Sequence, residues 1–176
     1  PFPSKDFAYV LGAVLGDGHI DKEDTVVLVV KDRDFAEAFS KCLGRLLNTQ
    51  CNVSSSVNGF GVKRVVGSMR SWLRRQTMAS ILCVLEGFEA DFVAGFFDAE
   101  GSVSWSTKQG VRVLSLRHSD LCLSSSNPVL VLLVRRLLMK LGIEHKLAQR
   151  GWSVRDWGNQ YASICKPSYQ IWIQKR

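Results

Sequence analysis

Two stretches of the chain share one layout: VLGAVLGDG at residues 10–18 and VAGFFDAEG at residues 93–101. Each has the pattern of an apolar helix that contains small residues and ends on an acid followed by a glycine. Negative charge is unfavourable at the C-terminal end of a helix, because the helix macrodipole is negative there. Two carboxylates in this position, in one chain, indicate a role beyond helix formation.

The two stretches stand at the heads of matching repeats. After each comes sequence with β character, then an amphipathic helix, then a predicted hairpin and a further segment that we expect to be helical. The sequence therefore predicts an α+β fold in which the order α-β-β-α-β-β-α occurs twice. We expect two pseudo-symmetric repeats, residues 1–87 and residues 88–176.

Local signals place the elements inside each repeat. Asp32 is the predicted N-cap of the first amphipathic helix, and Asn127, followed by Pro128 at the first helical position, caps the second. Asn58-Gly59 and Gly158-Asn159 are the predicted hairpin turns. The closing helical segments are expected at residues 69–87 and 167–176. In the first hairpin, the residues expected in the core are Val57, Phe60, Val62, Val65 and Val66.

Small residues recur at a four-residue spacing inside both head helices. Gly12 and Gly16 lie on one face of the first helix, and Gly95 and Ala99 lie on one face of the second. Small residues at this spacing let two helix backbones approach closely. We therefore expect the two helices to pack against each other at the interface between the repeats. That packing would bring the acids that end them close together.

The two acids are Asp17 and Glu100. A divalent cation would offset both their mutual repulsion and the unfavourable helix-end charge. Carboxylate oxygens and the free carbonyls of a helix C-terminus are the hard oxygen ligands that Mg²⁺ prefers. The alternative is that both acids are ordinary solvated helix ends. An EF-hand is excluded, because the glycine and the terminal glutamate of that loop are absent.

The composition favours a polyanionic partner. The net charge is +7 and the isoelectric point about 9.4, and most of the basic excess lies after Gly87. A hydrophobic content of 46% is enough for a substantial core, and apolar runs are too short to span a membrane. Five cysteines without a CxxC pattern indicate neither a disulfide framework nor a zinc site. We expect a soluble, intracellular protein that is not secreted.

The paired stretches resemble the two motifs of the LAGLIDADG homing endonucleases, in the single-chain form that carries both motifs. The repeat order is also that family's unit, so the resemblance covers nearly the whole chain. It implies antiparallel sheets that form a DNA-binding saddle, with the motif helices packed at the repeat interface. It also implies a monomer without an obligate protein partner, and an intron or intein origin.

The resemblance implies a site-specific endonuclease that hydrolyses both strands of a long double-stranded DNA target with Mg²⁺, a site that Mn²⁺ or Ca²⁺ can also occupy. Asp17 and Glu100 match the family's metal-binding acids, and Gly16 and Ala99 match the residues whose carbonyls can ligate the metal. Leu15 departs from the motif, which has an acid there; the second copy keeps that acid as Asp98.

A basic residue near each site is also implied by the resemblance. Lys31 matches such a position in the first repeat, and Ser125 is its expected counterpart in the second, so we expect asymmetric sites. The strands would contact DNA, with arginine reading guanine edges and lysine neutralising phosphate. The candidate DNA-binding residues are Lys63, Arg64, Arg70, Arg74, Lys108, Arg112, Arg117, Lys146, Arg150 and Arg155.

Two other interpretations stay open. A non-cleaving nucleic-acid binder on the same scaffold, such as an RNA splicing maturase, would bind RNA and need not keep both Asp17 and Glu100. A plain basic α+β scaffold would use those acids only as helix ends. Retention of the acid in both copies of the motif favours the endonuclease.

Overall fold

The computed structural model describes residues 3–103, 106–108, 111–113, 121–151, 153–156, 162–165 and 167–173. The chain forms two compact units, Pro1–Glu100 and Gly101–Arg176. Each contains one four-stranded antiparallel sheet together with helices. The predicted α+β class is confirmed.

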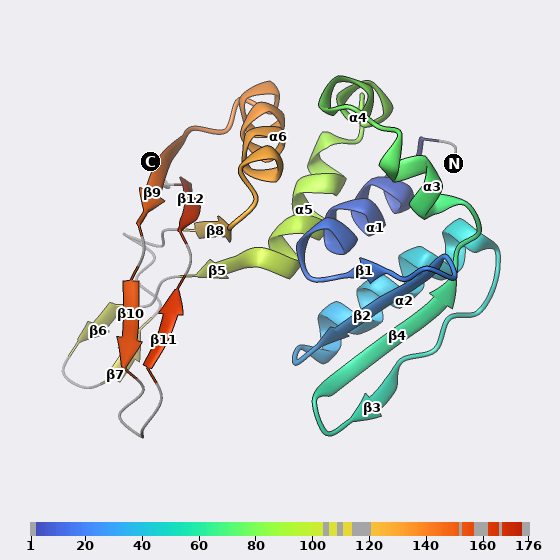
Figure 1. The fold of residues 1–176 in the computed structure, drawn as a ribbon, viewed down its shortest axis with the longest axis horizontal. Helices are drawn as coiled ribbons and strands as arrows, with labels where there is room; N and C mark the ends of the chain where they lie inside the picture. Colours follow the sequence, from blue (N-terminus) through green and yellow to red (C-terminus); the bar gives the residue numbers. More distant parts are fainter. Residues whose placement is uncertain are drawn as a thin grey trace. The chain divides into compact units, whose positions relative to one another are not determined.

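The first unit begins with the first motif helix and ends with the second (Figure 1). Its sheet has the strand order β1-β2-β4-β3, with every neighbouring pair antiparallel. The elements, in chain order, are α1 (Lys5–Gly16), β1 (His19–Ile20), β2 (Thr25–Val30), α2 (Arg33–Leu47), β3 (Ser54–Ser56), β4 (Gly59–Val65), α3 (Met69–Arg74), α4 (Met78–Val84) and α5 (Glu89–Glu100).

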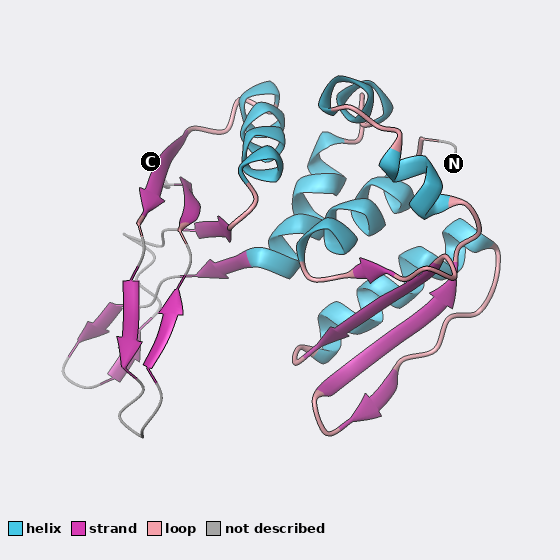
Figure 2. Ribbon diagram, in the orientation of Figure 1, coloured by secondary structure: helices cyan, strands magenta, loops and turns pink. Residues whose placement is uncertain are grey.

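The core of the first unit lies between the sheet and the helices. Figure 2 shows α2 behind this sheet and no helix in front of it. Val26, Leu28 and Val62 are at most 1% exposed and point from the strands into this core. The predicted cap of α2 is confirmed, because the Asp32 carboxylate accepts hydrogen bonds from the backbone N–H groups of the next turn.

The first hairpin is confirmed, but of its five expected core residues only Val62 is buried, while Phe60 and Val66 are half-buried. Its turn is Val57–Asn58, between the paired Ser56 and Gly59, so the predicted turn Asn58-Gly59 is wrong by one residue and Gly59 already belongs to β4. Val57 therefore lies at the tip of the turn and is fully exposed, while Val65 is 62% exposed. Because side chains alternate along a strand, Val65 lies on the face opposite the buried Val62. The error came from treating every valine in the segment as buried.

The second unit repeats the sheet order of the first. Its main sheet runs β5-β8-β12-β9, with β6–β7 and β10–β11 as two separate antiparallel pairs. The predicted cap at Asn127 is confirmed, with the amide oxygen accepting from Val129 and Leu130. The elements are β5 (Gly101–Val103), β6 (Ser106–Lys108), β7 (Val111–Val113), β8 (Leu121–Ser125), α6 (Pro128–Lys140), β9 (His145–Arg150), β10 (Ser153–Asp156), β11 (Ala162–Cys165) and β12 (Ser168–Ile173).

The helix predicted at residues 167–176 is wrong. Residues Ser168–Ile173 form β12, which pairs with both β8 and β9. The run SYQIWI is rich in aromatic and β-branched residues, which favour a strand with neighbours on both sides. The predicted turn at Gly158-Asn159 lies outside the described residues, between the paired strands β10 and β11.

The helical segment expected at residues 69–87 is present as two short helices, α3 and α4. Thr77 starts the second one through a reciprocal capping box with Ser80, and this new N-terminus divides the segment.

The compact units do not coincide with the predicted repeats. The helix α5 opens the second repeat in sequence, yet it belongs to the first compact unit because it packs against α1. The division into repeats 1–87 and 88–176 stays a prediction about sequence relatedness.

Candidate metal and nucleic-acid site

The two motif helices pack directly against each other, as the small-residue spacing predicts. A Cβ atom added at Gly12 would collide with the carbonyl oxygen of Phe92, and one added at Gly95 would collide with that of Tyr9. Backbone therefore meets backbone at the crossing of α1 and α5. Only glycine permits this approach, which is why two glycines are accepted inside helices at about 1 kcal/mol each.

The close contact continues to the C-terminal ends of the helices. A Cβ atom added at Gly16 would lie 2.5 Å from the Cβ of Ala99 and 3.1 Å from the Cγ of Glu100. Gly16 and Ala99, the residues whose carbonyls are candidate ligands, are thus neighbours across the helix pair. The contact also places Glu100 beside the end of α1.

The two acids are close enough to influence each other. Asp17 is the C-cap of α1 and donates its backbone N–H to the Ala13 carbonyl, while Glu100 is the last residue of α5. Asp17 is an exposed residue, but the neighbouring protein still raises the pKa of its carboxyl by removing part of its hydration. Burial also raises the pKa of Glu100, and the negative charge of Asp17 raises it further.

These residues fit a divalent cation. Two carboxylates lie at two helix ends, next to backbone carbonyls, and the electrostatics disfavour their charged forms without a counter-charge. Among the described residues, no group of three or more His, Cys, Asp and Glu side chains comes together to hold a metal. Any ion here would therefore complete its coordination with carbonyls, water or phosphate, as Mg²⁺ commonly does.

The raised pKa values predict a pH dependence of stability without metal. The folded chain holds protons on Asp17 and Glu100 more tightly than the unfolded chain, whose ordinary pKa values are 3.8 and 4.5. This contribution is present at low pH and is lost as the pH rises through the raised values. The double variant Asp17→Asn, Glu100→Gln should then be more stable than the parent near pH 7, by about 0.3–1 kcal/mol per removed helix-end charge.

Urea unfolding in EDTA from pH 3.5 to pH 7 measures this difference. The stability gap should shrink towards the acid end, and adding Mg²⁺ at pH 7 should stabilise only the parent chain. A gap that does not change with pH would contradict the assignment.

One contact at the helix pair was not found by sequence reasoning. The Tyr9 hydroxyl of α1 donates a 2.6 Å hydrogen bond to Oδ2 of Asp98 in α5. Asp98 thus braces the helix pair, and burial together with this carboxylate raises the pKa of Tyr9. At the equivalent positions of the other copy stand Phe92 and Leu15, which are both apolar. The signal in the sequence was this exchange of a polar pair for an apolar one.

Lys31 is exposed and lies between the end of β2 and Asp32, the N-cap of α2. Counting back from the two helix caps pairs Lys31 with Ser126 and Val30 with Ser125. The counterpart of Lys31 is therefore Ser126 and not the expected Ser125, because the caps Asp32 and Asn127 set the alignment of the two copies. The second-half residue is still not basic.

The basic residues predicted in the first unit separate onto different surfaces. Lys63 pairs with Val27 in β2, and its exposed side chain lies on the sheet face away from α2. The next residue, Arg64, points to the other side, where its guanidinium donates to the Thr49 hydroxyl after α2. Arg70 and Arg74 are one turn apart in α3.

In the second unit, Lys146 and Arg150 are exposed and lie on one face of β9. Cys122 of β8 lies on the same face, and burial raises the pKa of its thiol while the charge of Arg150 acts in the opposite direction. The buried Leu123 and Ile171 occupy the other face. Of the remaining candidates, Lys108 lies in β6, Arg112 in β7 and Arg155 in β10, and Arg117 lies outside the described residues.

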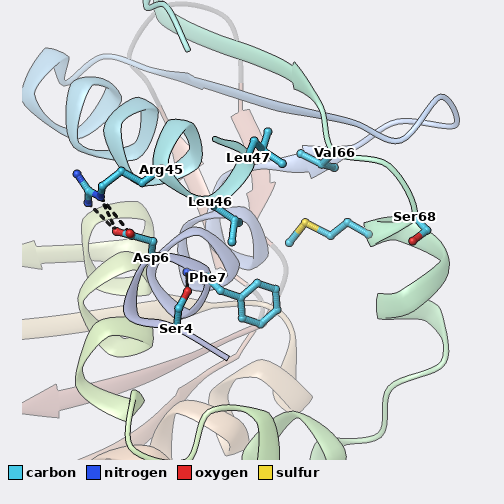
Figure 3. A pocket seen from close by; sticks show the side chains of 9 residues that line it. Ser4, Asp6, Phe7, Arg45, Leu46, Leu47, Val66 and Ser68 are labelled. Carbon is cyan, nitrogen blue, oxygen red and sulfur yellow. Dashed lines mark hydrogen bonds and ion pairs between the residues drawn. The ribbon is translucent and has the colours of Figure 1, made fainter. Parts of the chain in front are cut away.

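A pocket of about 510 Å³ lies at the opposite end of α1 from Asp17 (Figure 3). Phe7, Leu46 and Met69 contribute to its apolar lining. At its edge, Arg45 donates to both carboxylate oxygens of Asp6, which lowers the pKa of that acid. This pair ties α2 to the first turn of α1, and the pocket is separate from the acid pair.

A family model described as a LAGLIDADG-like domain matches residues 87–174, half of the chain. The chain belongs to the LAGLIDADG family. Its two motif helices, packed through their small residues, are the arrangement expected of the form with both motifs in one chain. The family assignment agrees with the sheet order that recurs in the two units.

A curated relative is "Uncharacterized protein MJ0314" of Methanocaldococcus jannaschii, which is 29% identical over 158 residues. The match covers 82% of this chain and 57% of that protein, so the LAGLIDADG chain spans little more than half of its relative's length.

Solved structures show the same fold. Variants of the homing endonuclease I-DmoI match with a TM-score of 0.59 at 17% identity, covering 96% of this chain and 88% of theirs. I-DmoI with DNA and Ca matches at 0.55 and 17% identity, covering 98% and 84%. Full-length DUF199/WhiA from Thermatoga maritima matches at 0.58 and 14% identity, covering 99% of this chain and 53% of WhiA.

Among the described residues, none of the helices has the length and apolar character needed to cross a bilayer.

Proposed function

We propose that this chain is a site-specific, divalent-metal-dependent endonuclease that hydrolyses both strands of a long double-stranded DNA target. The observation that carries the proposal is the acid pair. One carboxylate from each motif reaches the same end of the α1–α5 pair, and the charge of Asp17 raises the pKa of Glu100. A scaffold that used these residues only as helix ends would have no need for this juxtaposition.

In this proposal Asp17 and Glu100 hold the cations, together with the carbonyl groups of Gly16 and Ala99. Mg²⁺ is the proposed ion, and Mn²⁺ or Ca²⁺ would fit the same oxygen ligands. A bound ion would polarise the scissile phosphate and lower the pKa of a bound water. Each repeat contributes one acid as a metal ligand, and each acid would serve the cleavage of one DNA strand.

The other residues of the proposed site bind and orient the DNA. Lys31 would order solvent or hold phosphate near one of the two cleavage sites. Lys63, Lys146 and Arg150 lie exposed on strands and would contact the duplex. Arg70 and Arg74 would contact backbone phosphates, and Arg64 would contribute only if it left Thr49. Lys108, Arg112, Arg117 and Arg155 complete the proposed set.

Several wider expectations belong to the same proposal. The chain would act as a monomer built from repeats 1–87 and 88–176, without an obligate protein partner. It would be encoded by a mobile intron or intein and would act inside the cell.

The second candidate is a non-cleaving nucleic-acid binder, including an RNA splicing maturase. The fold similarity to WhiA, which is as strong as that to I-DmoI, keeps it in consideration. The acid pair favours the endonuclease over this candidate, since a binder gains nothing from two adjacent carboxylates that face a polyanion.

A cleavage selection on a randomised DNA library with Mg²⁺ tests the proposed function. We expect one family of related sequences to be cut on both strands, and no cutting in EDTA. Enrichment of bound sequences without any cutting would instead establish the second candidate.

The basic sheets predict a strong salt dependence. If six or more phosphates are neutralised, DNA affinity should fall roughly 10³-fold or more between 50 and 200 mM salt. A fluorescence anisotropy titration of a labelled target measures this slope. An affinity that hardly changes with salt would argue against the proposed phosphate contacts.

A further inference from the structure

The sheet of the first unit has an uncovered face with an unusual composition. Val27, Val29 and Val65 lie on the side away from α2, because they alternate with the buried residues of β2 and β4. Val29 is 50% exposed and Val65 is 62% exposed. Figure 2 shows no helix in front of this face.

The structure confirms that these residues share the face. An added Cβ atom at Gly61 would lie 3.8 Å from Cγ2 of Val29 and 3.3 Å from Oγ of Ser54. Gly61 pairs with Val29, and Lys63 pairs with Val27. The missing side chain of Gly61 therefore leaves a gap beside Val29, and Lys63 is the one lysine or arginine that β2 and β4 place on this face.

The second unit has a different composition on its edge strand β9. On β9 the exposed residues of one face are Lys146 and Arg150, which can donate hydrogen bonds to phosphate or guanine. The net charge of the chain is +7, yet the uncovered face of the first sheet carries branched aliphatic side chains. The proposed function requires this face to contact DNA.

We propose that the uncovered face of the first sheet reads thymine. Val29 and Val65, with Val27 between them on the same face, would contact the C5-methyl groups of thymines in the major groove of one half of the target. This inference rests on the proposed function and adds the base composition that this half-site must have.

The chemistry of the major groove supports this choice. Thymine alone among the four bases presents a methyl group there, and an aliphatic side chain distinguishes it by excluding water from that methyl. Valine has no donor or acceptor and cannot read guanine, cytosine or adenine by hydrogen bonding. Lys63 would supply the phosphate contact, and Gly61 would let a base edge approach the strand. Burying one methyl group should change affinity about fourfold.

The test begins with the target obtained from selection on the parent chain. Each thymine in each half-site is then replaced by uracil, which removes only the methyl group. We expect affinity to fall about fourfold for each contacted thymine, in one half-site only. The double variant Val29→Ser, Val65→Ser should bind the thymine and uracil targets equally, because it lacks the apolar partner.

The matched control is Val129→Ser in α6. Val129 is 55% exposed, so it is as accessible as Val29, but it lies on a helix and not on the sheet face. This variant should discriminate thymine from uracil as the parent does. Thermal unfolding checks that the variants are folded.

The outcomes separate this inference from the proposed function. If the parent binds and cuts DNA but does not distinguish thymine from uracil in either half-site, the inference is wrong and the function stands. The inference is also wrong if the double variant keeps the discrimination, or if the parent forms a dimer on size exclusion that the double variant does not form. If the parent does not bind DNA at all, the proposed function itself fails.

Discussion

Asp17→Asn or Glu100→Gln is expected to abolish double-strand cleavage while leaving DNA affinity nearly unchanged. Each substitution keeps the shape of the side chain and removes one charged ligand from the proposed cation site. Losing a metal ligand should cost several kcal/mol of transition-state stabilisation, which corresponds to about 10³-fold in rate. The side chains lie at the ends of α1 and α5, so the packing of the helix pair should survive.

A supercoiled plasmid that carries the selected target is the appropriate substrate, because it reports nicked and linear products separately. Asp34→Asn in the first turn of α2 is the matched control, since it also removes one exposed carboxylate from a helix end. That variant should linearise the plasmid at the parent rate. Linear product formed at the parent rate by either Asp17→Asn or Glu100→Gln would overturn the assignment of the acids.

Gly12→Ala and Gly95→Ala are expected to destabilise the fold by about 2–4 kcal/mol each. The added methyl groups would meet the carbonyl oxygens of Phe92 and Tyr9, which belong to backbone and cannot move aside without separating the helices. The direction of the stability change distinguishes close helix packing from helix propensity. Helix propensity alone predicts that alanine stabilises either position by about 1 kcal/mol.

Denaturant unfolding measures both variants. Gly151→Ala provides the control, because nothing lies within 4 Å of the position of its added Cβ. It should leave the free energy of unfolding nearly unchanged. If Gly12→Ala and Gly95→Ala proved stabilising, α1 and α5 could not be in backbone contact, and the two acids would lose the scaffold that joins them.

Sequence reasoning succeeded where a local signal has one physical meaning. Asp32 and Asn127 were recognised as caps because a short oxygen-bearing side chain before an amphipathic run can satisfy free backbone N–H groups. The helix pair followed from small residues at a four-residue spacing, because glycine weakens a soluble helix unless a second backbone packs against it. Both features are confirmed by the hydrogen bonds and the close contact of α1 with α5.

It failed where the outcome depends on partners distant in sequence. Residues 168–173 form a strand because β8 and β9 flank them on both sides, which no short window reveals. The exposure of Val65 depends on which face α2 covers. In the same way, Lys63 and Arg64 are adjacent in sequence but belong to opposite faces, and only the register with β2 separates them.

Sequence reasoning predicted the positions of the acid pair but not its electrostatics. The repeat located both carboxylates and predicted that they would meet, but their electrostatics required the structure. The raised pKa of Glu100 depends on its burial and on the charge of Asp17, which lies 83 residues earlier in the chain. The Tyr9–Asp98 hydrogen bond was missed because its one signal in the sequence is the apolar pair Phe92 and Leu15 at the equivalent positions of the other copy.

The most direct measurement is the anomalous scattering of Mn²⁺ in crystals of the chain bound to its selected DNA target. We predict an anomalous peak at the C-terminal ends of α1 and α5, with carboxylate oxygens of both Asp17 and Glu100 within about 2.0–2.4 Å of bound manganese. A well-ordered complex with intact DNA and no manganese at these carboxylates, or with manganese bound elsewhere, would contradict the account.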